Sequence, residues 1–158
     1  VARPQPRETV LDPCCGSGTL LAEAHGLQSH LAKLSGFDID PEAISVAREN
    51  LRKIPHGEAH TGDGTGTGRA DASIDLVLAN LPFGKQYGSK LDNPQFYEAI
   101  LREAVRLAKK PGWRAVMLTS DVPAFKSAIQ KVTQLKYEEA FTVKIRGEVS
   151  RCYQVTFK

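Results

Sequence analysis

The residues with the clearest chemical potential are Asn80-Leu81-Pro82-Phe83-Gly84, directly after a short apolar run. A run of this kind predicts a buried parallel strand, and ligands of open α/β sheets bind beyond the carboxyl ends of such strands. The Asn80 side-chain oxygen and the Leu81 carbonyl can accept the two hydrogens of an exocyclic amine. Pro82 stiffens the turn, and the Phe83 ring can stack on a base. The stretch therefore predicts an acceptor site for the amine of a nucleobase.

A glycine-bearing loop lies upstream at residues 12–19, Asp-Pro-Cys-Cys-Gly-Ser-Gly-Thr. If Gly16 and Gly18 belonged to a dinucleotide fingerprint, Gly or Ala would be needed at position 21, where Leu21 stands. The Asp12 carboxylate, directly before the loop, would repel a pyrophosphate and would attract an ammonium group. The loop therefore favours a nucleoside cofactor that has no phosphate and carries a positive charge.

Two further acids follow at the ends of the next two predicted strands. Asp38 lies about twenty residues past the glycines, where an acid can accept both hydroxyls of a ribose. Asp63 follows a weaker strand and is placed to accept from an adenine amino group. With Asp12, the three acids describe a site for an adenosine with a cationic aminoacyl tail. The alternative is that these acids have structural roles only: Asp12 would cap a helix, Asp38 and Asp40 would form a cap pair, and Asp63 would lie in a turn. We expect Asp40, which precedes Pro41, to be a helix cap and not a ligand.

Strands and helices alternate along the chain, without repeats or low-complexity tracts. Hydrophobic patterns predict strands at residues 9–11, 33–37, 58–61, 74–79 and 113–120. They predict helices at residues 18–29, 41–51, 94–108 and 123–132, and a terminal hairpin at residues 137–145 and 149–157. Repeated βα units imply a parallel sheet with right-handed crossovers. We therefore predict a doubly wound, mostly parallel, seven-stranded Rossmann-like α/β sheet with a C-terminal antiparallel hairpin.

Three of the predicted helices have an apolar stripe that should face the sheet. In the first helix the stripe comprises Leu20, Leu21, Ala24 and Leu27. In the second helix the stripe comprises Ile44, Ala47 and Leu51. In the third helix it comprises Phe96, Ile100, Leu101 and Val105.

Composition is that of an ordinary globular domain: 158 residues, of which 41% are hydrophobic and 25% charged. No apolar run approaches the roughly 20 residues that span a bilayer, and no secretory leader opens the chain. The three cysteines and four histidines have no metal-ligand spacing, so we expect reduced thiols and no metal. We expect a cytoplasmic protein, and one domain, residues 1–158, from a longer chain.

The net charge of +3 is unevenly distributed, because residues 1–80 carry more acids than bases and residues 81–158 the reverse. A basic half that begins at the acceptor motif favours the approach of a polyanion from that side. The alternative is that basic residues such as Lys109, Lys110, Lys126 and Lys131 lie on solvated helix faces.

Four motifs occur in order: Asp-Pro-x-Cys-Gly-Ser-Gly-Thr, Gly-x-Asp-x-Asp-Pro, Gly-Asp and Asn-Leu-Pro-Phe-Gly-Lys. From about Val10 to the C-terminal hairpin, the chain resembles the catalytic domain of THUMP-associated tRNA guanine-N2 methyltransferases. The resemblance implies S-adenosylmethionine as methyl donor, S-adenosylhomocysteine as product, no metal, and tRNA as substrate. It also implies an N-terminal THUMP-type region, absent from this chain, that grips the tRNA.

The matched motif positions give three sets of expected site residues. The catalytic set is Asn80, Leu81, Pro82 and Phe83. The cofactor set is Asp12, Cys14, Gly16, Gly18, Thr19, Asp38, Ile39, Gly62, Asp63, Gly64 and Asn80. The substrate set is Phe83, Gly84 and Lys85.

One departure from related enzymes leaves alternatives open. Many amino-methyltransferases have Pro-Pro after the acid or amide, whereas this chain has Leu81-Pro82. Because only the Leu81 carbonyl enters the argument, the chemistry is preserved. The alternatives are methylation of adenine N6 in nucleic acid, methylation of a protein glutamine amide, and a non-catalytic cofactor- or RNA-binding module.

Overall fold

A computed structural model of the chain describes residues 1–82, 92–145 and 147–158. Seven strands and four helices are present in the described part, in the predicted order. The strands are β1 (Thr9–Asp12), β2 (Lys33–Asp38), β3 (Gly57–Thr61), β4 (Leu76–Asn80), β5 (Arg114–Thr119), β6 (Leu135–Ile145) and β7 (Glu148–Phe157). The helices are α1 (Thr19–Leu27), α2 (Pro41–Leu51), α3 (Asn93–Leu107) and α4 (Val122–Lys131).

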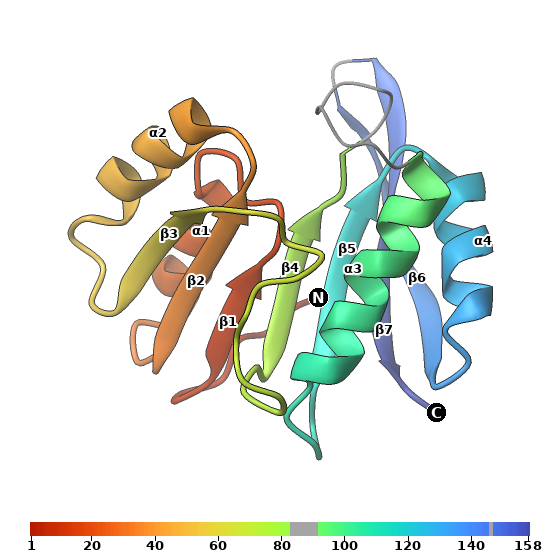
Figure 1. The fold of residues 1–158 in the computed structure, drawn as a ribbon, viewed down its shortest axis with the longest axis horizontal. Coiled ribbons are helices and arrows are strands. Elements are labelled where there is room, and N and C mark those ends of the chain that lie inside the picture. Colours follow the sequence, from red (N-terminus) through yellow and green to blue (C-terminus); the bar gives the residue numbers. More distant parts are fainter. Residues whose placement is uncertain (83–91, 146) are drawn as a thin grey trace.

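All strands belong to one sheet with the order β3-β2-β1-β4-β5-β7-β6 (Figure 1). Strands β1 to β5 pair in parallel, whereas β7 is antiparallel to both β5 and β6. The predicted seven-stranded, mostly parallel sheet with an antiparallel C-terminal hairpin is confirmed. Strand β1 lies between β2 and β4, so the sheet is wound outward in both directions from this point.

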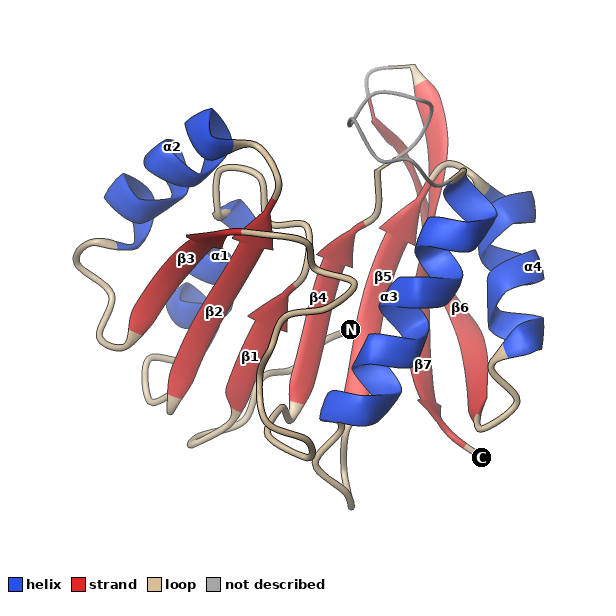
Figure 2. Ribbon diagram, in the orientation of Figure 1, coloured by secondary structure: helices blue, strands red, loops and turns tan. Residues whose placement is uncertain are grey.

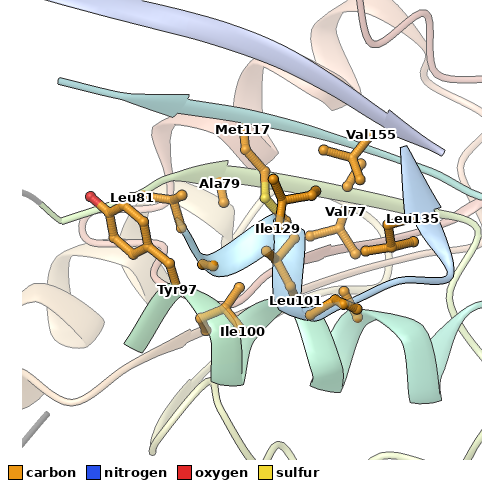
Figure 3. Close-up of a cluster of buried hydrophobic side chains, with 14 of the residues drawn as sticks. Val77, Ala79, Leu81, Tyr97, Ile100, Leu101, Met117, Ile129, Leu135 and Val155 are labelled. Atoms are coloured by element: carbon orange, nitrogen blue, oxygen red, sulfur yellow. The ribbon is translucent and has the colours of Figure 1, made fainter. Parts of the chain in front are cut away.

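Each face of the sheet has its own hydrophobic core. Helices α1 and α2 cover one face over β1 to β3, and α3 and α4 cover the other face over β4 to β7 (Figure 2). Figure 3 shows the second core, where α3 packs its side chains onto β4 and β5. Both cores leave the carboxyl ends of the strands at one edge, and this edge carries the candidate site.

The predicted helix stripes were partly wrong. In α1, Leu21 and Ala24 are buried, but Leu20 and Leu27 are exposed, at 37% and 77%. The stripe of α2 is buried as predicted. In α3, the residue sealed into the core is Tyr97, while Phe96 is only half-buried. Ile100 and Leu101 are buried as predicted, whereas Val105, like Phe96, is only partly buried. The buried positions of α3 recur every three or four residues from Tyr97, the period of an α-helix.

A long loop, residues 62–75, replaces a helix between β3 and β4 and crosses the sheet on the side of α3 (Figure 1). Arg69 from this loop contacts Glu58 of β3. Thr67 donates from its amide and its hydroxyl to Glu103 of α3, at 2.9 and 2.8 Å. Burial raises the pKa of Glu58, but hydrogen bonds from Lys33 and its other neighbours, Arg69 included, outweigh it and lower the pKa to about 2. The middle of the loop is therefore fixed to both β3 and α3.

Gly36, in the middle of β2, provides a test of this packing. A Cβ at Gly36 would lie 2.6 Å from the Sγ of Cys15, in the first turn of the glycine loop. Because both positions are in the core, we expect Gly36→Ala to lower the free energy of unfolding by about 1–3 kcal/mol. Denaturant unfolding measures this change.

Gly26 in α1 is the matched control, because a Cβ there would meet nothing within 4 Å. Gly26→Ala should leave stability unchanged or raise it by about 0.5–1 kcal/mol. Equal stability of the Gly36→Ala and wild-type proteins would contradict the close contact between β2 and the loop.

Candidate active site

The sheet order brings three of the predicted residues to neighbouring strand ends. Asp12 is the last residue of β1, Asp38 the last of β2 and Asn80 the last of β4. Since β1 pairs with both β2 and β4, these ends are adjacent. The site therefore lies where the sheet order reverses, as expected for an open α/β sheet.

Asp12 is a buried carboxylate with few donors around it. It is 1% exposed, and its Oδ1 accepts from the backbone N–H of Cys14 at 3.1 Å. Burial raises the pKa of Asp12 to about 7; the Cys14 hydrogen bond opposes this, and the Asp38 carboxylate adds to it. Among the described residues, no hydrogen bond reaches Oδ2. That oxygen is available to a cation at the mouth of the loop.

The glycine loop adopts the conformation that its glycines permit. Gly16 and Gly18 have φ angles of 51° and 78°, in the left-handed region. A Cβ on Gly16 would meet nothing within 4 Å, so open space adjoins the loop there. Gly18 is the N-cap of α1 and Thr19 its first residue, and no side chain caps this helix. The alternative role of Asp12 as a helix cap is therefore wrong.

Asp38 connects the glycine loop with the start of α2. Its Oδ2 accepts from the Gly16 N–H at 2.9 Å, and its Oδ1 accepts from the Asp40 N–H at 3.0 Å. Asp40 in turn accepts from Glu42 N–H at 2.9 Å, which confirms it as the cap of α2. Ile39, between the two acids, is a large apolar side chain that is 44% exposed. It offers an apolar surface beside the Asp38 carboxylate.

The loop after β3 packs against the glycine loop. The Gly62 N–H donates to the Asp38 carbonyl at 2.9 Å. A Cβ on Gly64 would lie 1.8 Å from the Pro13 carbonyl oxygen, so only glycine permits this approach. Asp63 Oδ1 accepts from both the N–H and the hydroxyl of Thr65, at 2.8 and 2.7 Å. Asp63 is thus a turn residue, as the structural alternative held, and its Oδ1 is already engaged.

Strand β4 contacts the glycine loop directly. The Sγ of Cys14 donates to the backbone carbonyl of Asn80 at 3.4 Å. Burial, followed by the negative charges of Asp12 and Asp38, raises the pKa of the Cys14 thiol well above its ordinary value, so the thiol keeps its hydrogen. The Asn80 side chain is exposed at the end of β4. The two motifs that the sequence singled out therefore open on the same edge.

Leu81 is held in place from both sides. Its N–H donates to the Leu118 carbonyl at 2.8 Å, and its side chain is 1% exposed in the core beside Tyr97 (Figure 3). No hydrogen bond between described residues involves the Leu81 carbonyl. The Pro82 carbonyl accepts from the Tyr97 hydroxyl at 2.6 Å.

Tyr97 and Thr119 are two further residues near the end of β4 that the sequence motifs did not indicate, and their hydroxyl oxygens lie 2.8 Å apart. Thr119 ends β5, the parallel neighbour of β4, so its place at a strand end was the available signal. Phe83, Gly84 and Lys85 lie outside the described residues.

The described residues contain no group of three or more His, Cys, Asp and Glu side chains that could hold a metal, and their cysteines are free thiols. Within the same residues, no helix has the length and apolar character required to cross a membrane. A cavity of about 630 Å³ lies away from the strand ends, between the N-terminal segment and β5 to β7, and it contains none of the predicted site residues.

Ion pairs account for part of the basic half of the chain. Lys109 pairs with Asp75 and Lys131 with Glu98, at 3.6 and 3.1 Å. Lys110 lies over the Phe157 ring, 3.7 Å from its centroid. Of the four lysines only Lys126 and Lys131 lie on a helix, because α3 ends at Leu107, so the alternative of solvated helix faces is wrong for Lys109 and Lys110. The approach of a polyanion stays a prediction.

Known proteins share both the sequence and the fold of this chain. The family described as "UPF0020: RMKL-like, methyltransferase domain" matches residues 1–151. The mouse (Mus musculus) tRNA (guanine(6)-N(2))-methyltransferase THUMP3 is 32% identical over 143 residues, which are 82% of this chain and 28% of that protein. The ribosomal protein L11 methyltransferase of Burkholderia mallei is 38% identical over 79 residues, 49% of this chain and 24% of that protein.

Among solved structures, TrmN from Thermus thermophilus superimposes with a TM-score of 0.83 and 27% identity, covering 99% of this chain and 46% of that one. The chain thus spans less than a third of the mouse relative and about half of TrmN. Because the family match covers nearly every residue and includes the whole strand-end site, the chain belongs to the UPF0020 family of RMKL-like methyltransferase domains.

Proposed function

We propose that residues 1–158 form the catalytic domain of an S-adenosylmethionine-dependent enzyme that methylates the N2 amine of a guanosine in tRNA. The observation that carries the proposal is the contact between Cys14 and Asn80, because it joins the glycine loop to the acceptor amide at one edge. The name of the mouse relative supports the choice of guanine N2 and tRNA.

The residues at the strand ends fit the proposed cofactor. The Asp12 Oδ2 is a buried acceptor suited to the ammonium group of the aminoacyl tail. The Asp38 carboxylate is placed for the ribose hydroxyls, with Gly16 and the open space beside it for the tail. Ile39 and the Asp63 loop would border the adenine. When bound, S-adenosylmethionine supplies a methyl group on a positively charged sulfur, and S-adenosylhomocysteine remains; the proposal requires no metal.

The acceptor residues would orient a weak nucleophile. The lone pair of a guanine exocyclic amine is delocalised into the ring, so the amine reacts only when held in position. The Asn80 side-chain oxygen and the Leu81 carbonyl would accept its two hydrogens and direct the nitrogen at the methyl group. Such orientation can recover roughly 7–11 kcal/mol of a reaction barrier. Asn80 need not be a base, since the amine loses its proton after transfer.

Three further acceptor residues remain proposals from the sequence: Phe83 to stack on the base, and Gly84 with Lys85 to contact the substrate. Stacking of a base on an aromatic ring is worth about 1–3 kcal/mol. We propose that a THUMP-type region in the longer protein supplies most of the affinity for tRNA. We also propose that the protein acts in the cytoplasm.

A second candidate function is methylation of a protein amide. The ribosomal protein L11 methyltransferase aligns with 49% of this chain at 38% identity, which supports a protein substrate in general and not an amide in particular. Incubation of the full-length protein with isotopically labelled S-adenosylmethionine and either a tRNA pool or ribosomal proteins separates the two. Labelled N2-methylguanosine in a nucleoside digest supports the proposal. Labelled protein, labelled N6-methyladenine, or cofactor binding without turnover on any of these substrates rejects it.

The division of labour between Asn80 and Asp38 gives a prediction. Asn80→Ala should remove turnover and leave cofactor affinity nearly unchanged, because its exposed side chain faces the acceptor. Asp38→Ala should weaken cofactor binding by about 1–3 kcal/mol, through unpaired ribose hydroxyls and a loosened Gly16 amide. Calorimetry measures the affinity and the labelled-methyl assay the turnover.

The control is Asp40→Ala, which removes the cap of α2 and keeps the Asp38 carboxylate. It should cost stability of about 1 kcal/mol and leave cofactor affinity unchanged. Equal losses of affinity and turnover in Asn80→Ala would refute the assignment of Asn80 to the acceptor.

The raised pKa of Asp12 predicts a pH-dependent stability. Between its ordinary value near 4 and about 7, the folded protein holds a proton that the unfolded chain releases. The contribution of Asp12 is therefore fully present below pH 4 and lost as pH rises to 7. Relative to Asp12→Asn, the wild-type protein without cofactor should lose on the order of a few kcal/mol across this range.

Unfolding at several pH values, with and without S-adenosylhomocysteine, measures this difference. The amino acid tail of the product also carries an ammonium group, so saturation with it should reduce the loss in the wild type. A wild-type profile parallel to that of Asp12→Asn would contradict the burial of a proton at Asp12. An equal response of both proteins to S-adenosylhomocysteine would contradict its pairing with the ammonium.

A further inference from the structure

A buried line of hydroxyl groups runs beneath the acceptor motif. Tyr97 of α3 and Thr119 of β5 are both 0% exposed, and their oxygens lie 2.8 Å apart. The Tyr97 oxygen is 2.6 Å from the Pro82 carbonyl, and the Thr119 oxygen is 3.0 Å from the Asp121 backbone N–H. The line thus joins the acceptor loop to the start of α4.

The chemistry of the end groups determines the direction of every hydrogen in this line. A carbonyl only accepts, so the single hydrogen of the Tyr97 hydroxyl points to Pro82. The Tyr97 oxygen must then accept from Thr119. The Thr119 oxygen accepts from the Asp121 N–H, which only donates. Burial raises the pKa of Tyr97 to about 12, so the phenol keeps its hydrogen at neutral pH.

Asp121, at the far end of this line of hydroxyl groups, is held by two further hydrogen bonds. The Asp121 carboxylate caps α4 by accepting from the Ala124 N–H at 3.0 Å, and its other oxygen accepts from the Asn93 side chain at 2.8 Å. The first turns of α3 and α4 are therefore joined to each other, and both support the hydroxyl line. Aligned hydrogen bonds of this kind strengthen one another in a buried environment.

The two anchors of the acceptor loop lie on either side of the Leu81 carbonyl. The Leu81 N–H is bound to Leu118, and the Pro82 carbonyl is bound to Tyr97. With the amide before it and the carbonyl after it both fixed, the Leu81 carbonyl has little freedom to rotate. Burial of the Leu81 side chain adds a third restraint.

We propose that Tyr97 is a positioning residue, which acts through the Pro82 carbonyl to hold the Leu81 carbonyl in the orientation that receives the acceptor amine. This proposal rests on the proposed function, since it deepens the role of the Leu81 carbonyl. Tyr97 does not touch the substrate. Its effect is that the backbone at Leu81 and Pro82 need not change conformation during methyl transfer.

The test is Tyr97→Phe in the full-length protein, with two separate readouts. The first is hydrogen exchange of the Leu81 amide, which needs no substrate; we expect exchange about tenfold faster, while the amides of the β4 interior stay protected. The second is methylation of tRNA at a temperature well below the unfolding midpoint. There we expect kcat to fall about tenfold, with the dissociation constant of S-adenosylmethionine unchanged.

Tyr153→Phe is the matched control. Tyr153 is also 0% exposed in the same core, stacked on Phe125, but its hydroxyl has no hydrogen-bond partner among the described residues. The same chemical change should therefore leave Leu81 exchange and kcat unaltered. Thr119→Val, which interrupts the line one step further back, should give changes in the same direction as Tyr97→Phe but smaller.

The outcomes are distinguishable. Unchanged Leu81 exchange in Tyr97→Phe overturns the proposal, whatever the substrate. Faster exchange with unchanged kcat on a tRNA that the wild type methylates also overturns it. A matching loss in Tyr153→Phe would assign the effect to general loosening of the core and count against Tyr97. A wild-type protein inert towards tRNA rejects the proposed function, while the exchange experiment still decides whether Tyr97 holds the loop.

Discussion

The parallel pairing of β1 with both β2 and β4 is the constraint on which the site depends. In a parallel sheet all carboxyl ends lie at one edge, and the crossover helices must go to opposite faces once the winding direction reverses. Here α1 and α2 take one face and α3 and α4 the other, and both layers leave the carboxyl ends of the strands at one edge. The acids that end β1 and β2 and the amide that ends β4 therefore share one edge.

This edge keeps a carboxylate in an environment that disfavours its charge. Asp12 is buried next to a second acid and accepts a single hydrogen bond among the described residues. A protein that optimised stability alone would place an apolar residue there, because an isolated buried charge is costly. A cationic ligand relieves that cost, and the relief becomes binding energy. Buried carboxyl groups whose pKa is shifted in this way are typical of ligand sites.

The end of β4 follows a different physical rule. Among the described residues, the groups that hydrogen-bond to the backbone of Leu81 and Pro82 are neutral, and they hold that backbone in place. The buried hydroxyls of Tyr97 and Thr119, the Leu81 amide and the core contacts of Leu81 all serve this end. The end of β1 thus has a carboxylate with few hydrogen-bond donors, whereas the end of β4 is held by satisfied hydrogen bonds.

The sequence by itself determined the fold class, the order of the elements and most of the candidate residues. Apolar periodicity reports which face of an element is buried, and the motifs at residues 12–19 and 80–84 report local loop chemistry. Both signals are local, so they failed where local patterns are ambiguous: Leu27 was assigned to the core and Tyr97 was overlooked, because a tyrosine in an apolar stripe carries no mark of a hydroxyl partner.

Only the tertiary structure decided which distant groups meet. Cys14 and Asn80 are 66 residues apart, and Tyr97 meets a carbonyl 15 residues before it and a hydroxyl 22 residues after it. Periodicity fixes the face on which a residue lies but not the strand that lies beside it. The order of strands and the depth of burial at β1 come from packing of the whole sheet, and so do the pKa of Asp12 and the restraint on Leu81.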